Sequence, residues 1–125
     1  MNKDKRPTVV VVGGGWGGCS AAFSARKAGA RVILLERADM LMGTALVGGL
    51  MGNNARHTAA VEMTVMGGGD MVEAAQACIR HRHVHIPKQV GTWLFDSYRL
   101  EGEVSRRLEA AGVEVHLKSS VTKVA

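Results

Sequence analysis

Six residues near the start of the chain, GGGWGG at 13–18, combine residue types and a spacing that could hold a phosphate group. They supply Gly13, Gly15 and Gly18 as the pattern GxGxxG, which in dinucleotide-binding proteins joins a buried strand to a helix. In that setting the first glycine turns the chain tightly, the second lets the backbone approach a pyrophosphate, and the third lets helix and strand pack closely. The free N–H groups of the helix N-terminus would then face the negative charge of the diphosphate.

An acidic residue follows at the spacing that this chemistry needs. Glu36 lies 21 residues beyond Gly15, at the end of a second apolar run. A carboxylate there accepts hydrogen bonds from a ribose 2′-hydroxyl and repels a 2′-phosphate, so NADP is disfavoured. We expect its replacement by Gln to weaken nucleotide binding with little effect on stability, because Glu36 ends its strand at the open ligand crevice. The motif does not choose between NAD and FAD.

The elements that must position these residues form a βαβ unit. Residues 8–12 (TVVVV) and 31–35 (RVILL) are continuous apolar runs, which is typical of parallel strands buried on both faces. Between them, residues 17–28 are small and alanine-rich with apolar residues at helical spacing, and Gly29 stands where a helix C-terminal glycine belongs. The sequence therefore predicts an α/β protein with a Rossmann-like parallel sheet.

Two further helices are predicted. Asp70 with Glu73 has the form of a capping box opening a helix at about residues 71–82. Asp96 could cap another helix over residues 97–111, which places several apolar side chains on one face.

The rest of the chain contains a third strand and two irregular segments. Residues 113–117 (VEVHL) form the third strand, and residues 83–91 are a short extended segment interrupted by Pro87. Residues 37–69 are rich in Gly, Met and small residues and fit neither the helix nor the strand period. We predict a cofactor-side or substrate-side loop there, within a single domain that spans residues 1–125.

Composition limits the function classes. The 125 residues provide one domain, and the net charge of +5 comes from basic residues that are scattered rather than gathered in a stripe, which disfavours nucleic acid binding. No apolar run approaches the ~18 residues that span a bilayer. The polar residues 1–7 do not have the form of a signal peptide, and Cys19 and Cys78 match no zinc spacing. We expect free thiols, a cytoplasmic location and no metal.

Three stretches resemble one family of flavoproteins. Residues 9–37 (VVVVGGGWGGCSAAFSARKAGARVILLER) look like the N-terminus of FAD-dependent oxidoreductases of the glutathione-reductase-like superfamily. Residues 41–52 (LMGTALVGGLMG) resemble the segment after the acidic residue in the group related to succinate dehydrogenase flavoproteins. Residues 100–125 are similar to the helix and strand that lead to the adenine contact. The resemblance implies FAD as the cofactor.

The resemblance also implies which residues of this chain contact FAD. The pyrophosphate would lie on the glycine loop, the adenosine ribose on Glu36, and adenine near Arg37 and the backbone of Val121. Gly43 and Thr44 fall where the family has a glycine pair beside the diphosphate and ribityl chain, with Thr in place of the second glycine. The glycine-loop contacts are Gly13, Gly14, Gly15, Trp16, Gly17 and Gly18.

The family's C-terminal glycine and aspartate motif, which holds the flavin side, has no counterpart before Ala125. The resemblance therefore implies a FAD-binding subunit or N-terminal part of a flavin-dependent oxidoreductase that acts on a small-molecule substrate. A second polypeptide would complete the FAD domain and the substrate domain, making a hetero-oligomer. The alternative is a freestanding NAD-binding or ADP-binding module without catalysis.

Other residues could do chemistry, but we favour a solvated or diphosphate-facing cluster for the three alternating histidines, a surface position for His57 and a structural role for Cys19. His81, His83 and His85 alternate and could share one face of an extended segment, although the intervening arginines would repel a metal ion. His57 lies in the glycine-rich loop and could face a flavin or substrate. Cys19 lies near a helix N-terminus, where a small residue is needed for packing.

Overall fold

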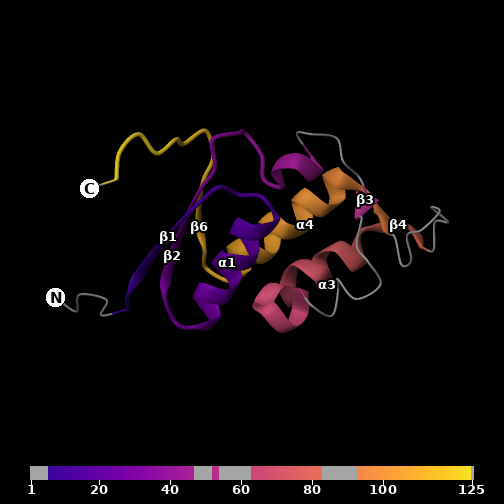
Figure 1. Ribbon diagram of the computed structural model, residues 1–125, viewed down its shortest axis with the longest axis horizontal. Helices are drawn as coiled ribbons and strands as arrows, with labels where there is room; N and C mark the ends of the chain where they lie inside the picture. The colour runs from indigo at the N-terminus through magenta and orange to yellow at the C-terminus, as the bar shows by residue number, and fades with distance from the viewer. Residues whose placement is uncertain (1–5, 47–51, 54–62, 83–92, 125) are drawn as a thin grey trace.

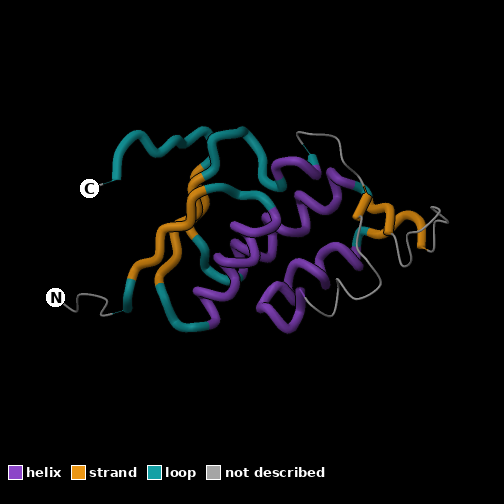
Figure 2. The backbone as a smooth tube through the Cα atoms, viewed as in Figure 1, coloured by secondary structure: helices purple, strands orange, loops and turns teal. Residues whose placement is uncertain are grey.

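A computed structural model describes residues 6–46, 52–53, 63–82 and 93–124. The fold is α/β, as predicted: a parallel three-stranded sheet carries helices on one face, and a small antiparallel sheet lies at the opposite end of the molecule (Figure 1; Figure 2).

The predicted βαβ unit is confirmed. Strand β1 (Thr8–Val12), helix α1 (Trp16–Lys27) and strand β2 (Arg31–Leu35) follow one another, and β1 pairs with β2 in parallel. The helix ends because Gly29 adopts a left-handed conformation with φ of 89°. The chain then turns directly into β2.

The third strand lies where the sequence indicated. Strand β6 (Glu114–His116) pairs in parallel with β2, so the sheet order is β1-β2-β6. It is one residue shorter at each end than the predicted segment. Among the described residues, only β2 pairs with β1, which leaves β1 at the edge of the sheet.

Helix α4 (Ser97–Ala110) agrees with the prediction. The Asp96 side chain accepts a hydrogen bond from the Arg99 N–H at 3.1 Å, which is the expected N-terminal cap. Leu100, Val104 and Leu108 are fully buried on one face of the helix.

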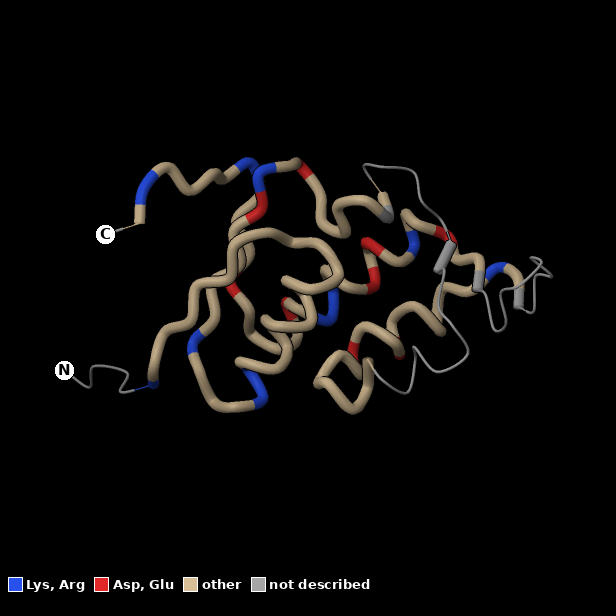
Figure 3. Tube along the Cα trace, viewed as in Figure 1, with Lys and Arg blue, Asp and Glu red and all other residues tan. Residues whose placement is uncertain are grey.

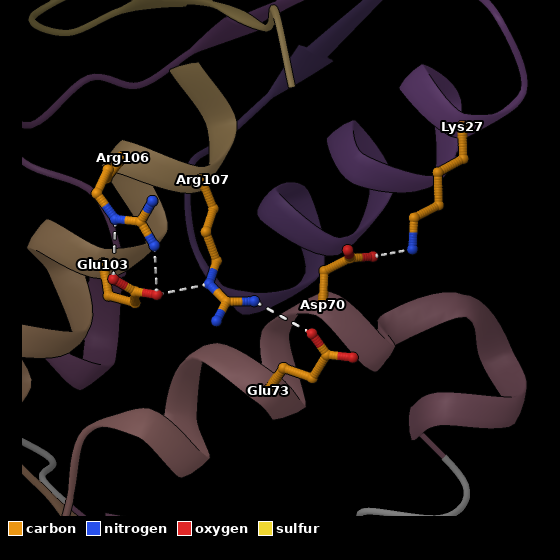
Figure 4. A network of polar contacts seen from close by, with 6 residues as sticks. All are labelled: Lys27, Asp70, Glu73, Glu103, Arg106 and Arg107. Atoms are coloured by element: carbon orange, nitrogen blue, oxygen red, sulfur yellow. Dashed lines mark hydrogen bonds and ion pairs between the residues drawn. The ribbon is translucent and has the colours of Figure 1, made fainter. Parts of the chain in front are cut away.

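The predicted capping box at Asp70 and Glu73 is wrong. Helix α3 (Gly69–Ala77) begins earlier, with Gly68 as its N-cap, because a π-helical segment η2 (Thr64–Gly68) runs directly into it. The two carboxylates instead pair between helices. Asp70 Oδ2 lies 2.6 Å from Lys27 Nζ, and Glu73 Oε2 lies 3.2 Å from a guanidinium nitrogen of Arg107 (Figure 4).

The C-terminal end of that helix was also predicted wrongly. It ends at Ala77, because Ile79–Arg82 forms strand β4 and pairs antiparallel with β5 (Trp93–Phe95). Strand β3 (Gly52–Asn53) pairs with the other edge of β5. A short 3₁₀ helix η1 (Gly43–Ala45) lies within the predicted loop.

The core lies between the parallel sheet and helices α1, α3 and α4. Among the described residues, 18 are buried in it. They include Phe23 of α1, Val32 and Leu34 of β2, Met71 of α3 and Leu100 of α4. Leu41 and Met42, from the loop after β2, are each only 1% exposed and belong to the same core.

The other face of the parallel sheet is not covered by any described helix. Strand alternation places Val10 and Val12 of β1 on that face, where their side chains are 52% and 65% exposed. Their neighbours on β2, Ile33 and Leu35, are half-buried. Lys and Arg are spread over several elements rather than gathered on one (Figure 3).

Candidate functional site

The glycine loop after β1 has the geometry that its sequence predicted. Gly13 has φ of 97°, a conformation that side chains disfavour. A Cβ on Gly18 would lie 1.7 Å from the Gly13 carbonyl oxygen, so α1 packs against the loop only because that position is glycine. A Cβ on Gly15 would meet nothing within 4 Å, so the space beside this residue is open.

Gly14 has a role that the spacing did not reveal. Its N–H donates to Glu36 Oε2 at 2.6 Å. A Cβ there would lie 2.5 Å from Leu41 Cδ2 and 3.2 Å from Glu36 Oε2. Gly14 is therefore held between Glu36 and Leu41, which belongs to the segment that follows Glu36.

Glu36 is buried, with 7% of its surface exposed. Its second oxygen, Oε1, accepts a hydrogen bond from the Ala38 N–H at 2.8 Å. Burial raises the pKa of Glu36, but the backbone donors of Ala38, Gly14 and Arg37 outweigh it, and the net pKa lies below 4.5. These hydrogen bonds join two backbone segments through the Glu36 carboxylate, so its replacement should lower stability, contrary to our expectation from the sequence.

A cleft of about 350 Å³ opens at the carboxyl ends of β1 and β2, beside the segment that follows β6. In an open parallel sheet this is the edge at which ligands bind. Its lining includes three residues predicted to contact the adenosine part, Glu36, Arg37 and Val121. The full lining is Val12, Gly13, Leu35, Glu36, Arg37, Ser119, Ser120 and Val121.

The wall of the cleft formed by residues 119–121 was only partly predicted. The Ser119 N–H donates to the Glu36 carbonyl and the Lys118 N–H to the Ala38 carbonyl, each at 2.9 Å. These bonds continue the pairing of β6 with β2 beyond the end of both strands. Ser119 and Ser120 thereby enter the cleft lining, and no spacing pattern pointed to them.

The structure brings Gly43 to the glycine loop, since a Cβ on Gly43 would lie 3.7 Å from Gly15 Cα. Its neighbour Thr44 is exposed. Trp16, the first residue of α1, packs its ring against Phe95 with the centroids 5.9 Å apart. Gly17 is exposed on the first turn of α1.

Residues 8–125 match the sequence profile of the family described as FAD dependent oxidoreductase. The chain belongs to the FAD dependent oxidoreductase family. FAD is accordingly its cofactor, which resolves the choice that the glycine motif left open. Among curated protein sequences, none matches this chain.

Solved structures share the fold of this family member. THI4 from Thermovibrio ammonificans is 19% identical, with a TM-score of 0.59 over 90% of this chain and 38% of that one. A mutant of 2-methyl-3-hydroxypyridine-5-carboxylic acid oxygenase is 17% identical, with a TM-score of 0.62 over 91% of this chain and 32% of that one. FqzB is 23% identical, with a TM-score of 0.61 over 95% and 30%. The chain thus spans about a third of the length of these proteins.

The residues present fit the phosphate and ribose groups of FAD. The space beside Gly15 is open, and Gly15, the N-cap residue of α1, makes no side-chain cap hydrogen bond. A helix N-terminus of this kind attracts a phosphate. Glu36 is among the residues that line the cleft, and a carboxylate can accept hydrogen bonds from hydroxyl groups.

Cys19 has the packing role that we expected. It is fully buried, and its Sγ lies 3.3 Å from the Gly14 carbonyl oxygen. Burial, followed by the charges of Glu36 and Glu101, raises the pKa of the Cys19 thiol to about 12. The thiol therefore stays protonated and unreactive at neutral pH.

Three of the four histidine candidates, His57, His83 and His85, lie outside the described residues. His81 is exposed on β4. Within the described ranges, no group of three His, Cys, Asp or Glu side chains could hold a metal ion. Nor is any helix in the described part of the chain long and apolar enough to cross a membrane.

Proposed function

We propose that this chain holds the ADP half of FAD in a flavin-dependent oxidoreductase. The observation that carries the proposal is that Gly13, the first residue of the glycine loop, and Glu36 line one cleft at the end of the parallel sheet, while the Gly14 N–H donates to the Glu36 carboxylate. In this assignment the glycine loop, residues 13–18, binds the diphosphate and Glu36 binds the adenosine ribose. Arg37 and Val121 flank adenine.

The chain's own groups would bind and orient the cofactor. The N–H groups of the first turn of α1 would donate to the diphosphate, and their partial positive charge would offset its charge. Each Glu36 oxygen already accepts one backbone N–H and retains a lone pair for a ribose hydroxyl. The flavin supplies hydride transfer when bound. We assign residues 37–69 to the cofactor side of this single domain, with Gly43 and Thr44 nearest the diphosphate.

We further propose that a second polypeptide completes the sheet and supplies the flavin and substrate sites for a small-molecule reaction. The support is the state of β1. The Gly13 N–H bonds to the Leu35 carbonyl, and the Arg31 N–H bonds to the Pro7 carbonyl. Because backbone groups alternate sides along a strand, the N–H and C=O groups of Val10 and Val12 point away from β2. No described strand pairs with these groups, and an open edge on so apolar a strand is one that proteins normally cover.

The competing function is a nucleotide-binding module that takes NAD or ADP and catalyses nothing. Purification of the chain followed by an absorbance spectrum and titrations with FAD, NAD and ADP separates the two functions. We expect FAD and ADP to bind in competition, because both carry the same ADP group. A colourless protein that binds NAD and ignores FAD would contradict the proposed function.

A further inference from the structure

Met42 has a backbone conformation that is unusual for its residue type. Its φ is 76°, in the left-handed region, and its side chain is 1% exposed. A residue other than glycine in this region is strained and persists only where its surroundings enforce the conformation. Such residues concentrate at ligand sites, so the contacts that hold Met42 are informative.

Those contacts come from the glycine loop and from α4. The Met42 N–H donates to the Gly14 carbonyl at 2.8 Å, and the buried Leu41 side chain packs on Gly14. The Leu41 N–H forms a long hydrogen bond of 3.4 Å to Glu101 Oε1. That carboxylate is fixed in turn by the Ser105 hydroxyl, which donates to the same oxygen at 3.0 Å.

The consequence of this arrangement is the position of Gly43. Met42 and Gly43 both have positive φ, of 76° and 48°, and together they turn the chain back toward the glycine loop. Gly43 therefore lies close to Gly15, since a Cβ on Gly43 would be 3.7 Å from the Gly15 Cα.

We propose that Met42 and Glu101 are positioning residues, which hold the turn at residues 41–43 so that the Gly43 backbone forms a second wall of the diphosphate site. The inference rests on the proposed function. Neither side chain need touch FAD, because Met42 is buried in the core and Glu101 acts through the Leu41 amide. If the turn is open in some of the molecules, the measured affinity for FAD equals the intrinsic affinity multiplied by the fraction of molecules in which the turn is closed.

The first test compares two substitutions of equal volume. Met42→Leu keeps an unbranched Cβ, whereas Met42→Ile is β-branched and tolerates a positive φ poorly. In FAD titrations of the full chain we expect Met42→Leu to bind within about twofold of wild type and Met42→Ile to bind at least about fivefold more weakly. Met71→Leu and Met71→Ile are the matched controls, because Met71 is fully buried in α3. They measure how much the same two changes affect FAD affinity at an ordinary helical φ.

The second test uses Glu101, which can be changed without filling the core. Glu101→Gln keeps an acceptor for the Leu41 N–H, so its FAD affinity should stay at the wild-type level. Glu101→Met removes that acceptor and should weaken FAD binding by about fivefold. Glu109→Met, at an exposed position of the same helix, is the control. Hydrogen exchange of the Leu41 and Met42 amides should accelerate in Glu101→Met and not in Glu109→Met.

Equal FAD affinities for Met42→Ile and Met42→Leu, or unchanged exchange in Glu101→Met, would overturn the inference. A loss of affinity that merely follows the loss of folded protein in thermal melts would also count against it. If the wild-type chain binds no FAD, the proposed function fails. The exchange of the Leu41 amide still decides whether Glu101 holds the turn.

Discussion

At the scale of single residues, the Glu36 carboxylate serves two purposes. It accepts from the N–H groups of Gly14 and Ala38, so it fixes the glycine loop and the turn after β2. Glu36 also lines the cleft in which we propose that the ribose binds. We therefore expect a substitution of this side chain to change both stability and nucleotide binding.

Glu36→Gln should lower the free energy of unfolding by about 1–3 kcal/mol, because one backbone N–H then faces an amide NH₂ group. FAD binding should weaken by ~1.5 to 3 kcal/mol, the worth of a charged hydrogen bond to ribose. Urea denaturation and FAD titration measure the two effects. Glu109→Gln, on the exposed side of α4, is the control. Unaltered FAD affinity with a lower stability would leave Glu36 purely structural.

The stability difference between wild type and Glu36→Gln should depend on pH. The pKa of Glu36 lies below its ordinary value of 4.5, so the ionised group stabilises the fold above about pH 4.5. This contribution is lost as the pH falls through the folded-state pKa. Hydrogen bonds from Arg106 and Arg107 lower the pKa of Glu103 to about 2. Glu103 is present in both proteins, so its contribution cancels in the stability difference between them. A difference that stays constant from pH 6 to pH 2 would contradict this assignment.

The sequence predicted the glycine-loop residues and Glu36 because their spacing along the chain is itself the signal. It did not predict the clamp on Gly14, because Leu41 meets that residue only after β2 and its turn are folded. Ser119 and Ser120 were missed for a related reason. They enter the cleft through hydrogen bonds between the segments that follow β2 and β6, and no periodicity encodes such bonds.

At the scale of elements, the packing of α1 on the glycine loop depends on one absent side chain. Gly18→Ala would place a Cβ 1.7 Å from the Gly13 carbonyl oxygen, so we expect a loss of at least about 2 kcal/mol in stability. Gly17→Ala meets nothing within 4 Å and should be neutral or stabilise the helix by about 0.5 kcal/mol. Chemical denaturation of both variants tests the contrast. Equal effects would show that helix propensity, not close packing, governs this turn.

Helix caps show where local sequence was sufficient and where it was not. Asp96→Ala should cost about 1 kcal/mol, because Asp96 caps α4. Asp70→Ala should cost less, since Asp70 lies inside α3 and its main partner is Lys27, an exposed ion pair worth at most about 1 kcal/mol. Thermal melts of the two variants, with salt titration for Asp70→Ala, measure this difference. The capping box failed as a prediction because η2 supplies the preceding turn, and η2 is packed against α1.

At the scale of the whole molecule, the described sheet is protected on one side only. Helices α1, α3 and α4 lie on one face (Figure 1), while Val10 and Val12 are exposed on the other. Parallel sheets are normally buried on both faces. The sequence predicted a strand buried on both faces, because the run at residues 8–12 is β-branched and uncharged. Among the described residues β1 instead lies at the edge of the sheet with one face exposed, so burial on both faces remains a prediction about a larger assembly.

The amide exchange of β1 should reveal whether a partner is required. In the isolated chain we expect slow exchange for Val9 and Val11, whose N–H groups point toward β2, and fast exchange for Val10 and Val12, whose N–H groups point to the open edge. The isolated chain should also self-associate with rising concentration, and Val12→Lys should reduce this association by placing a charge on the edge strand. Addition of the completing polypeptide should slow exchange at Val10 and Val12 while leaving Val9 and Val11 unchanged. A monomer that binds FAD tightly with all four amides protected would show that no second polypeptide is needed.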